Sequence, residues 1–199
     1  MDLPWSIPEK KHANYRKVSK TLVSENILTQ NFGAEDKNKV WVGDITYIKT
    51  KEGFLYLMVY LDVYTRKVAG WSMDNRMKEQ LALNAIQAAV WAENPPQELI
   101  VHTDRGSQFI GKKYKDLLNK HGLIASMSRP GNPYDNAVVE AIHKTLKTEL
   151  MRGLRAFDSR ETAKKAVFEY IEIFYNRQRR HSALGYKSPR QFEMQNCPI

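Results

Sequence analysis

Three strand-like segments follow one another across residues 40–73, and they constrain the fold more than any other feature of the chain. The segments VWVGDITYIKT, FLYLMVYLDVY and KVAGWSM are rich in valine, isoleucine, tyrosine and tryptophan, which are residues that strands favour. Only a few residues separate one segment from the next. Connections that short join antiparallel neighbours, so the pattern predicts a meander that begins a sheet.

The rest of the chain alternates between helical and strand patterns. Apolar residues at helical spacing predict helices over residues 78–93, 111–120, 137–152 and 159–177. Apolar runs predict two more strands, over residues 98–103 and 123–127. Prolines, glycine and asparagines in SRPGNPYDN predict a loop before the third helix. The order is typical of an α/β domain with a mixed five-stranded sheet, helices on both faces and a C-terminal helical extension.

Composition suggests three parts. Residues 1–36 are polar and charged without a core pattern, so we expect an N-terminal basic linker or the remnant of an upstream domain. Residues 37–155 form the expected core, and residues 156–199 a C-terminal helix and basic tail packed on it. The longest apolar run, FLYLMVYL, is far shorter than the roughly 20 residues of a spanning helix. We therefore expect a cytoplasmic protein.

Three acidic residues are candidates for one site. Asp44 lies inside the first strand among apolar neighbours, where a carboxylate is costly unless it is paired or binds a metal. Asp104 ends the fourth strand, and Glu140 lies at the fourth position of the third helix. If the first and fourth strands are neighbours, Asp44 and Asp104 project at one place. Alternatively, Asp44 is a hydrogen-bonded core residue, Asp104 a turn residue and Glu140 a first-turn acid that complements the helix dipole.

The motifs around these acids resemble those of a known family. WVGDITYI, HTDRGSQF and SRPGNPYDNAVVEAIHKTLKTEL, with 35 residues between Asp104 and Glu140, resemble the three motifs of DDE transposases of bacterial insertion sequences. The likeness is greatest to the orfB-type product, which is related to retroviral integrases. It covers about residues 31–192, and YNRQRRHSALGYKSPRQF matches the C-terminal signature of that group. The residues after Glu140 depart from the family's usual Ser-Phe-Phe, which puts the packing beneath the site in doubt.

The resemblance implies a ribonuclease-H-like fold and a polynucleotidyl transferase. Asp44, Asp104 and Glu140 would be both the catalytic residues and the ligands of Mg²⁺ or Mn²⁺, with two ions when DNA is bound. Oxygen ligands suit these cations, and a chain whose single cysteine is Cys197 has no multi-cysteine zinc site. The expected reaction is strand cleavage at the element's ends followed by strand transfer.

Positive charge points to DNA as the partner. The net charge is +9, which favours polyanions. On the third helix, Glu140, His143, Lys144 and Lys147 recur at helical spacing, so one face carries the acid and a row of basic residues. We expect His143, Lys144 and Lys147 to contact phosphates without reading sequence, although such a row is also typical of a solvated surface.

Other basic residues have two interpretations. Arg105, beside Asp104, is expected near a phosphate. Arg179 and Arg180 in the tail either bind DNA or complement the C-terminal end of the long helix.

The resemblance also implies partners. The family recognises its terminal repeats through a helix-turn-helix domain, and the sequence before Asp44 shows none with its own core. We expect an upstream helix-turn-helix product or fused domain, and a homo-oligomer that acts on transposon ends and target DNA. One alternative is a non-catalytic DNA-binding regulator of transposition. Another is a ribonuclease-H-type nuclease, which would hydrolyse RNA and never join strands.

Overall fold

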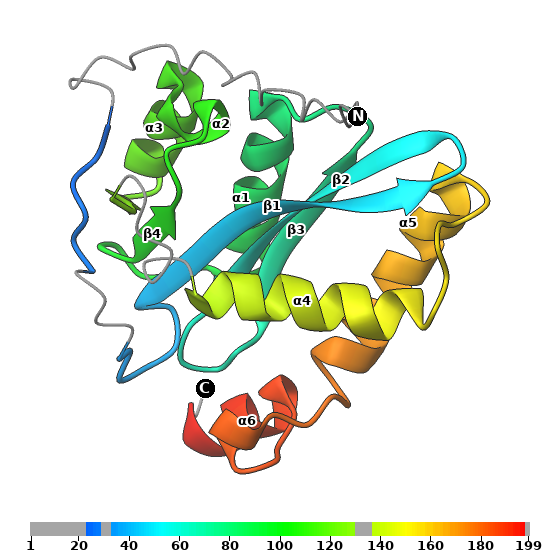
Figure 1. Cartoon of the computed structure of the whole chain (residues 1–199). Coiled ribbons are helices and arrows are strands. Elements are labelled where there is room, and N and C mark those ends of the chain that lie inside the picture. Colours follow the sequence, from blue (N-terminus) through cyan, green and yellow to red (C-terminus); the bar gives the residue numbers. More distant parts are fainter. Residues whose placement is uncertain (1–22, 29–32, 130–136, 198–199) are drawn as a thin grey trace, which may run out of the picture.

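The computed structural model describes residues 23–28, 33–129 and 137–197. The strands are β1 (Val40–Thr50), β2 (Gly53–Asp62), β3 (Val68–Asp74), β4 (Ile100–Thr103) and β5 (Ile124–Met127). The α-helices are α1 (Glu79–Glu93), α2 (Ser107–Ile110), α3 (Lys112–Lys120), α4 (Ala137–Met151), α5 (Arg160–Phe168) and α6 (Pro189–Asn196) (Figure 1). A π-helical segment, η3 (Glu169–Tyr175), and a 3₁₀ turn, η4 (Ser182–Leu184), lie between α5 and α6.

The strands form one mixed sheet in the order β3-β2-β1-β4-β5. β1, β2 and β3 are the predicted antiparallel meander. β4 pairs in parallel with β1, and β5 pairs in parallel with β4. The helix α1 provides the crossover between β3 and β4. The five-stranded mixed sheet is confirmed, as is the adjacency of the first and fourth strands.

Helices cover both faces of the sheet, as predicted. Alternate residues of β2 show the division: Leu57 and Val59 belong to the core on the α4 and α5 side, whereas Met58 and Tyr60 belong to the core on the α1 and α3 side. Figure 1 shows α1 and α4 on opposite faces. Because β2 is buried on both faces, its sequence is continuously apolar rather than alternating.

Close contact between α1 and the meander depends on small residues. Ala82, Ala85 and Ala89 form part of the buried face of α1. At Gly70 of β3, a Cβ would lie only 2.4 Å from the backbone nitrogen of Ala89. No larger residue fits at position 70 without moving the helix.

The long C-terminal helix is present, but its winding differs from the prediction. Ser159 caps α5 by accepting a hydrogen bond from the backbone nitrogen of Thr162. From Glu169 the helix becomes π-helical, and this segment buries Tyr170, Ile171 and Tyr175. A π-helical turn contains an extra residue, which a regular helical spacing does not reveal.

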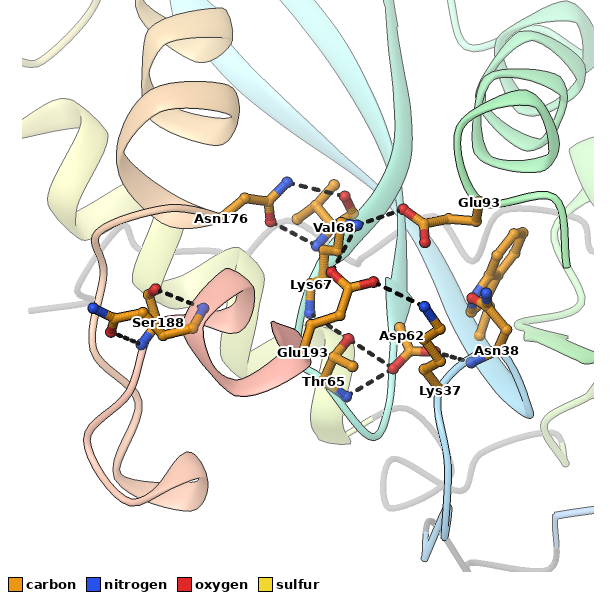
Figure 2. Close-up of polar contacts among 12 residues, drawn as sticks. Lys37, Asn38, Asp62, Thr65, Lys67, Val68, Glu93, Asn176, Ser188 and Glu193 are labelled. Carbon is orange, nitrogen blue, oxygen red and sulfur yellow. Dashed lines mark hydrogen bonds and ion pairs between the residues drawn. The ribbon is translucent and has the colours of Figure 1, made fainter. Parts of the chain in front are cut away.

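Polar contacts fix the C-terminal segment to the core (Figure 2). The ammonium of Lys67, after β2, lies 2.8 Å from a carboxylate oxygen of Glu93 at the end of α1 and 3.0 Å from one of Glu193 in α6. The side chain of Asn176 bonds both backbone groups of Val68, at 2.9 and 3.1 Å. The tail thus closes over the β2–β3 turn. The domain limits at residues 36 and 155 stay a prediction.

Part of the expected N-terminal linker lies along the sheet. The backbone nitrogen of Met127 donates to the carbonyl of Glu25, and that of Ile27 donates to the hydroxyl of Ser126. Leu28 is buried in the core. Residues 1–22 and 29–32 of the linker, and residues 130–136 of the predicted loop, lie outside the described residues. Within the described ranges, no helix is long and apolar enough to cross a bilayer.

Candidate active site

Asp44 and Asp104 lie at neighbouring points of adjacent parallel strands. The ladder pairs Val42 of β1 with His102 of β4. Two residues farther along each strand, a side chain returns to the same face, and these positions are Asp44 and Asp104. Burial raises the pKa of Asp104, and the negative charge of Asp44 raises it further. Asp44 is therefore close enough to Asp104 for its charge to influence the ionisation of Asp104.

A tight turn orients Asp104. The backbone nitrogen of Gly106 donates to Oδ1 of Asp104 at 2.8 Å, and this bond opposes the rise in the pKa of Asp104. A Cβ at position 106 would lie 2.9 Å from that same oxygen and 2.4 Å from Oε1 of Gln108. Asp104 is thus a turn residue as well as a member of the acid pair, and Gly106 leaves room for its carboxylate.

Arg105 is bonded to the segment that follows β5. Its Nε donates to the backbone carbonyl of Ser128 at 2.8 Å. The side chain is partly exposed. Contact between Arg105 and DNA stays a prediction.

Glu140 lies in the first turn of α4 and is exposed. The same helix packs Ile142 and Leu146 into the core against the sheet. Among the described residues, no three His, Cys, Asp or Glu side chains form a group that could hold a metal ion. The structure therefore brings Asp44 and Asp104 together and leaves Glu140 outside the pair. The catalytic role of all three residues stays a prediction.

His143 occupies an unexpected position, one turn after Glu140. Its Nδ1 lies 3.3 Å from Oδ2 of Asp44, and only 7% of the residue is exposed. Its Nε2 is buried and has no hydrogen-bond partner in the described part of the chain. In this structure the side chain is buried against Asp44, and contact between His143 and DNA phosphates stays a prediction. The helical spacing indicates that His143 and Glu140 share one face of α4, but it does not show which residues that face contacts.

The other basic residues that were expected to bind DNA differ in their exposure and in their contacts within the protein. Lys144 is exposed, whereas the ammonium of Lys147 lies 4.2 Å from the ring centroid of Tyr47 in β1. Arg179 binds Glu149 of α4 through two nitrogens, each 2.9 Å from a carboxylate oxygen. Its guanidinium therefore binds a neighbouring helix instead of complementing the end of its own. The other predicted tail cation, Arg180, is exposed.

The acid pair fits a divalent cation in its chemistry. Both members offer carboxylate oxygens, the ligands that Mg²⁺ and Mn²⁺ prefer. Asp44 and Asp104 are partly buried, and like charges at such a position repel each other. A cation between them would relieve that repulsion.

Known proteins share these features. Two models of the integrase core domain match residues 34–133 and 121–189. The transposase for insertion sequence element IS904 of Lactococcus lactis is 47% identical over 186 residues, which cover 94% of this chain and 73% of that protein. The chain belongs to the insertion-sequence transposases.

A second transposase and two solved structures extend the comparison. Transposase InsF for insertion sequence IS3fB of Escherichia coli is 51% identical over 174 residues, covering 87% of this chain and 60% of InsF. The HTLV-2 integrase catalytic core domain in complex with magnesium, in its trimeric form, matches with a TM-score of 0.60 and 18% identity over 80% of this chain and 99% of that one. The catalytic core domain of BIV integrase matches with a TM-score of 0.59 and 19% identity, over 79% and 95%.

These matches confirm the predicted ribonuclease-H-like fold and the predicted family. The transposase carries the integrase core, so its enzyme class is polynucleotidyl transfer.

Proposed function

We propose that this transposase cleaves DNA at the ends of an insertion sequence and joins the freed ends to target DNA, with Asp44, Asp104 and Glu140 as its catalytic acids. The observation that carries the proposal is the proximity of Asp44, inside β1, to Asp104, directly after the adjacent strand β4, near the helix that bears Glu140. Acidic residues with a purely structural role are seldom placed this close together, because their negative charges repel each other.

The proposed chemistry has two phosphoryl-transfer steps. In the first, water attacks the phosphorus at the element's end, the bond to the 3′ oxygen breaks, and a 3′-hydroxyl and a 5′-phosphate remain. In the second, that 3′-hydroxyl attacks a phosphodiester of the target, forms a new bond and releases a target 3′-hydroxyl. Such steps require positioning and charge neutralisation more than a covalent nucleophile.

The chain's own residues would divide this work. Asp44 and Asp104, joined by Glu140, would hold Mg²⁺ or Mn²⁺, with two ions when DNA is bound. When bound, such ions stabilise charge on the attacking and leaving oxygens. His143 would keep Asp44 in place, and Gly106 would orient Asp104. Lys144 and Lys147 would neutralise backbone phosphates beside Glu140.

The proposal includes partners. The chain spans 60% of the length of InsF, so a further domain, such as a helix-turn-helix, would recognise the terminal repeats. Matching structures include a simian T-cell lymphotropic virus intasome and a trimeric HTLV-2 integrase core. A homo-oligomer that joins two transposon ends to target DNA, in the cytoplasm, would account for both steps.

A resealing assay tests the proposal. The protein would be incubated with Mn²⁺ and a branched DNA that mimics the product of strand transfer, since this substrate brings the strands together without a recognition domain. Asp44→Asn, Asp104→Asn and Glu140→Gln should each lower the resealing rate by about a hundredfold or more. DNA binding, followed by fluorescence anisotropy, should persist in all three variants.

Asp116→Asn is the matched control, because Asp116 is an exposed acid of α3. Its resealing rate should equal that of the unaltered protein. Full activity in the three acid variants would contradict the proposal. DNA binding without any metal-dependent resealing by the unaltered protein would instead favour the non-catalytic regulator.

A further inference from the structure

A basic cavity of about 600 Å³ lies beside α4, outside the acid pair. Four parts of the chain contribute to it: α4, the end of η3, the tail and the β2–β3 turn. Its lining residues are Arg66, Ala141, Ile142, Thr145, Tyr175, Arg179, Arg180, His181, Ser182, Ala183 and Tyr186. Ligand pockets of small molecules have volumes of about 300–1,000 Å³, so one nucleotide would fit.

The charge of the cavity favours an anion. Three arginines and no acidic residue occur among its described lining residues. Arg179 binds Glu149, but Arg66 and Arg180 make no ion pair with any carboxylate of the described ranges. Burial lowers the pKa of Arg66. A partly desolvated guanidinium without a bound carboxylate is a ready partner for a phosphate.

Two tyrosines that line the cavity offer a hydroxyl and an aromatic ring that a nucleotide can contact. Tyr175 is 1% exposed, and its hydroxyl has no hydrogen-bond partner among the described residues. Buried hydroxyls nearly always have one, so a partner outside the described residues is expected. Tyr186 is 71% exposed and offers a ring on which a base can stack.

The cavity also lies next to the proposed path of DNA. The wall that α4 contributes contains Ala141 and Thr145. Ala141 directly follows Glu140, and Thr145 directly follows Lys144, and both Glu140 and Lys144 belong to the face of α4 that we propose binds DNA. Consecutive helix residues lie about 100° apart around the axis. A strand bound along Glu140 and Lys144 could therefore place a neighbouring nucleotide in the cavity.

We infer that this cavity binds one unpaired nucleotide of the DNA strand that passes Glu140. Arg66 and Arg180 contact its phosphate, Tyr186 stacks on its base, and the hydroxyl of Tyr175 bonds to its polar edge or sugar. The inference rests on the proposed function, because that function supplies the DNA strand. The nucleotide is unpaired because a base that stacks on a side chain must leave its neighbours in the strand, which costs least when it is not paired.

Binding of a fluorescent 12-nucleotide single-stranded DNA, measured by anisotropy without divalent metal, tests the inference. Arg180→Ala and Tyr186→Ala should each weaken binding about tenfold. The controls are Arg190→Ala, an exposed arginine of α6, and Trp91→Ala, an exposed aromatic residue of α1. Neither lines the cavity, so each should bind within about twofold of the unaltered protein. Losses that are equal in cavity variants and controls would overturn the inference.

Tyr175→Phe separates ligand binding from folding. The hydroxyl that it removes has no partner in the described protein, so the thermal unfolding midpoint should stay the same or rise. DNA affinity should nevertheless fall about fivefold, as expected from the loss of one hydrogen bond. A lower midpoint with unchanged affinity would overturn the role of Tyr175.

The absence of metal keeps this test independent of the catalytic proposal. If branched DNA is resealed while the cavity variants bind like the controls, the cavity inference fails and the proposed function stands. If the cavity variants lose affinity while no resealing occurs, the proposed function fails and the nucleotide site stands. Photocrosslinking with bromodeoxyuridine in the same DNA should modify a peptide that contains Tyr186, and modification only outside the cavity would overturn the inference.

Discussion

Asp44 has two close neighbours of different chemistry, a carboxylate and an imidazole. Asp104 lies close enough on the adjacent strand for the charges of the two carboxylates to interact, while His143 approaches Asp44 from α4 at 3.3 Å. An imidazole that contacts a ligand carboxylate fixes its rotamer and sustains its affinity for metal. His143 is therefore expected to act through Asp44 as a positioning residue.

His143→Ala should lower strand resealing about tenfold at limiting Mn²⁺, because an unsupported Asp44 binds the ion less tightly. Raising the Mn²⁺ concentration should restore most of the rate. The measurement is the resealing rate as a function of Mn²⁺, together with circular dichroism to follow folding.

Thr148→Ala provides the control for His143, since Thr148 is an exposed residue of the same helix. It should leave the Mn²⁺ dependence unchanged. If His143→Ala lowers the rate equally at every Mn²⁺ concentration, the positioning role is contradicted.

At the scale of elements, Lys67 links the end of α1 to α6. Its ammonium contacts Glu93 and Glu193, whose side chains are only 9% and 18% exposed. Lys67→Ala would leave the poorly solvated Glu93 without its cation, and Glu193 would keep only Lys37, whose ammonium lies 3.5 Å away. We expect the free energy of unfolding to fall by about 1–2 kcal/mol, measured by urea denaturation.

The pair Lys51–Asp158 is the matched control for Lys67. It joins the β1–β2 turn to the start of α5 at 2.6 Å, but both side chains are highly exposed, at 71% and 80%. Lys51→Ala should leave the denaturation midpoint unchanged, because exposed ion pairs contribute little. Equal destabilisation by Lys51→Ala and Lys67→Ala would show that the burial of the Lys67 contacts has no energetic effect.

Elements with a strong local pattern were predictable from sequence. The meander and the helix at residues 78–93 follow from apolar periodicity, because each element must bury an apolar face in the core whatever its neighbours are. α2, the π-helical winding of η3 and α6 were not predicted. α2 and α6 are short, and a regular helical spacing does not reveal the extra residue of a π-helical turn.

The acidic residues of the site were predictable from the sequence, but the residues that surround them were not. Their places on the predicted strands identified Asp44 and Asp104, and the pairing of β1 with β4 confirms the assumed adjacency. Periodicity placed His143 on the face of Glu140, yet no local pattern shows which neighbour a helix face contacts. The cavity was not foreseen, because four separate segments contribute its walls.

For the molecule as a whole, His181 links stability to pH. Burial, together with the positive charges of Arg179 and Arg66, lowers the pKa of His181 to about 4. An unfolded histidine titrates near 6.5, so between these values the unfolded chain binds more protons than the folded one. The stabilising effect of neutral His181 is therefore complete above about pH 6.5 and is lost as the pH falls towards 4.

Thermal unfolding midpoints measured from pH 7 to pH 4 test this link. His181→Asn should reduce the fall in midpoint across that range, since asparagine takes up no proton. The variant and the unaltered protein should differ most in slope between pH 6 and pH 4. Parallel curves for the two proteins would contradict the assignment.

The parallel pairing of β1 with β4 has a consequence for how the molecule acquires activity. Asp44 and Asp104 are distant in sequence, and their strands pair through only three residue pairs, from Val40↔Ile100 to Val42↔His102. Long-range pairing of this kind forms slowly, because the intervening chain must close a loop first. A growing or partly folded chain would have the meander but not the acid pair. The acid pair would therefore form later than the meander, once the crossover through α1 has placed β4 beside β1.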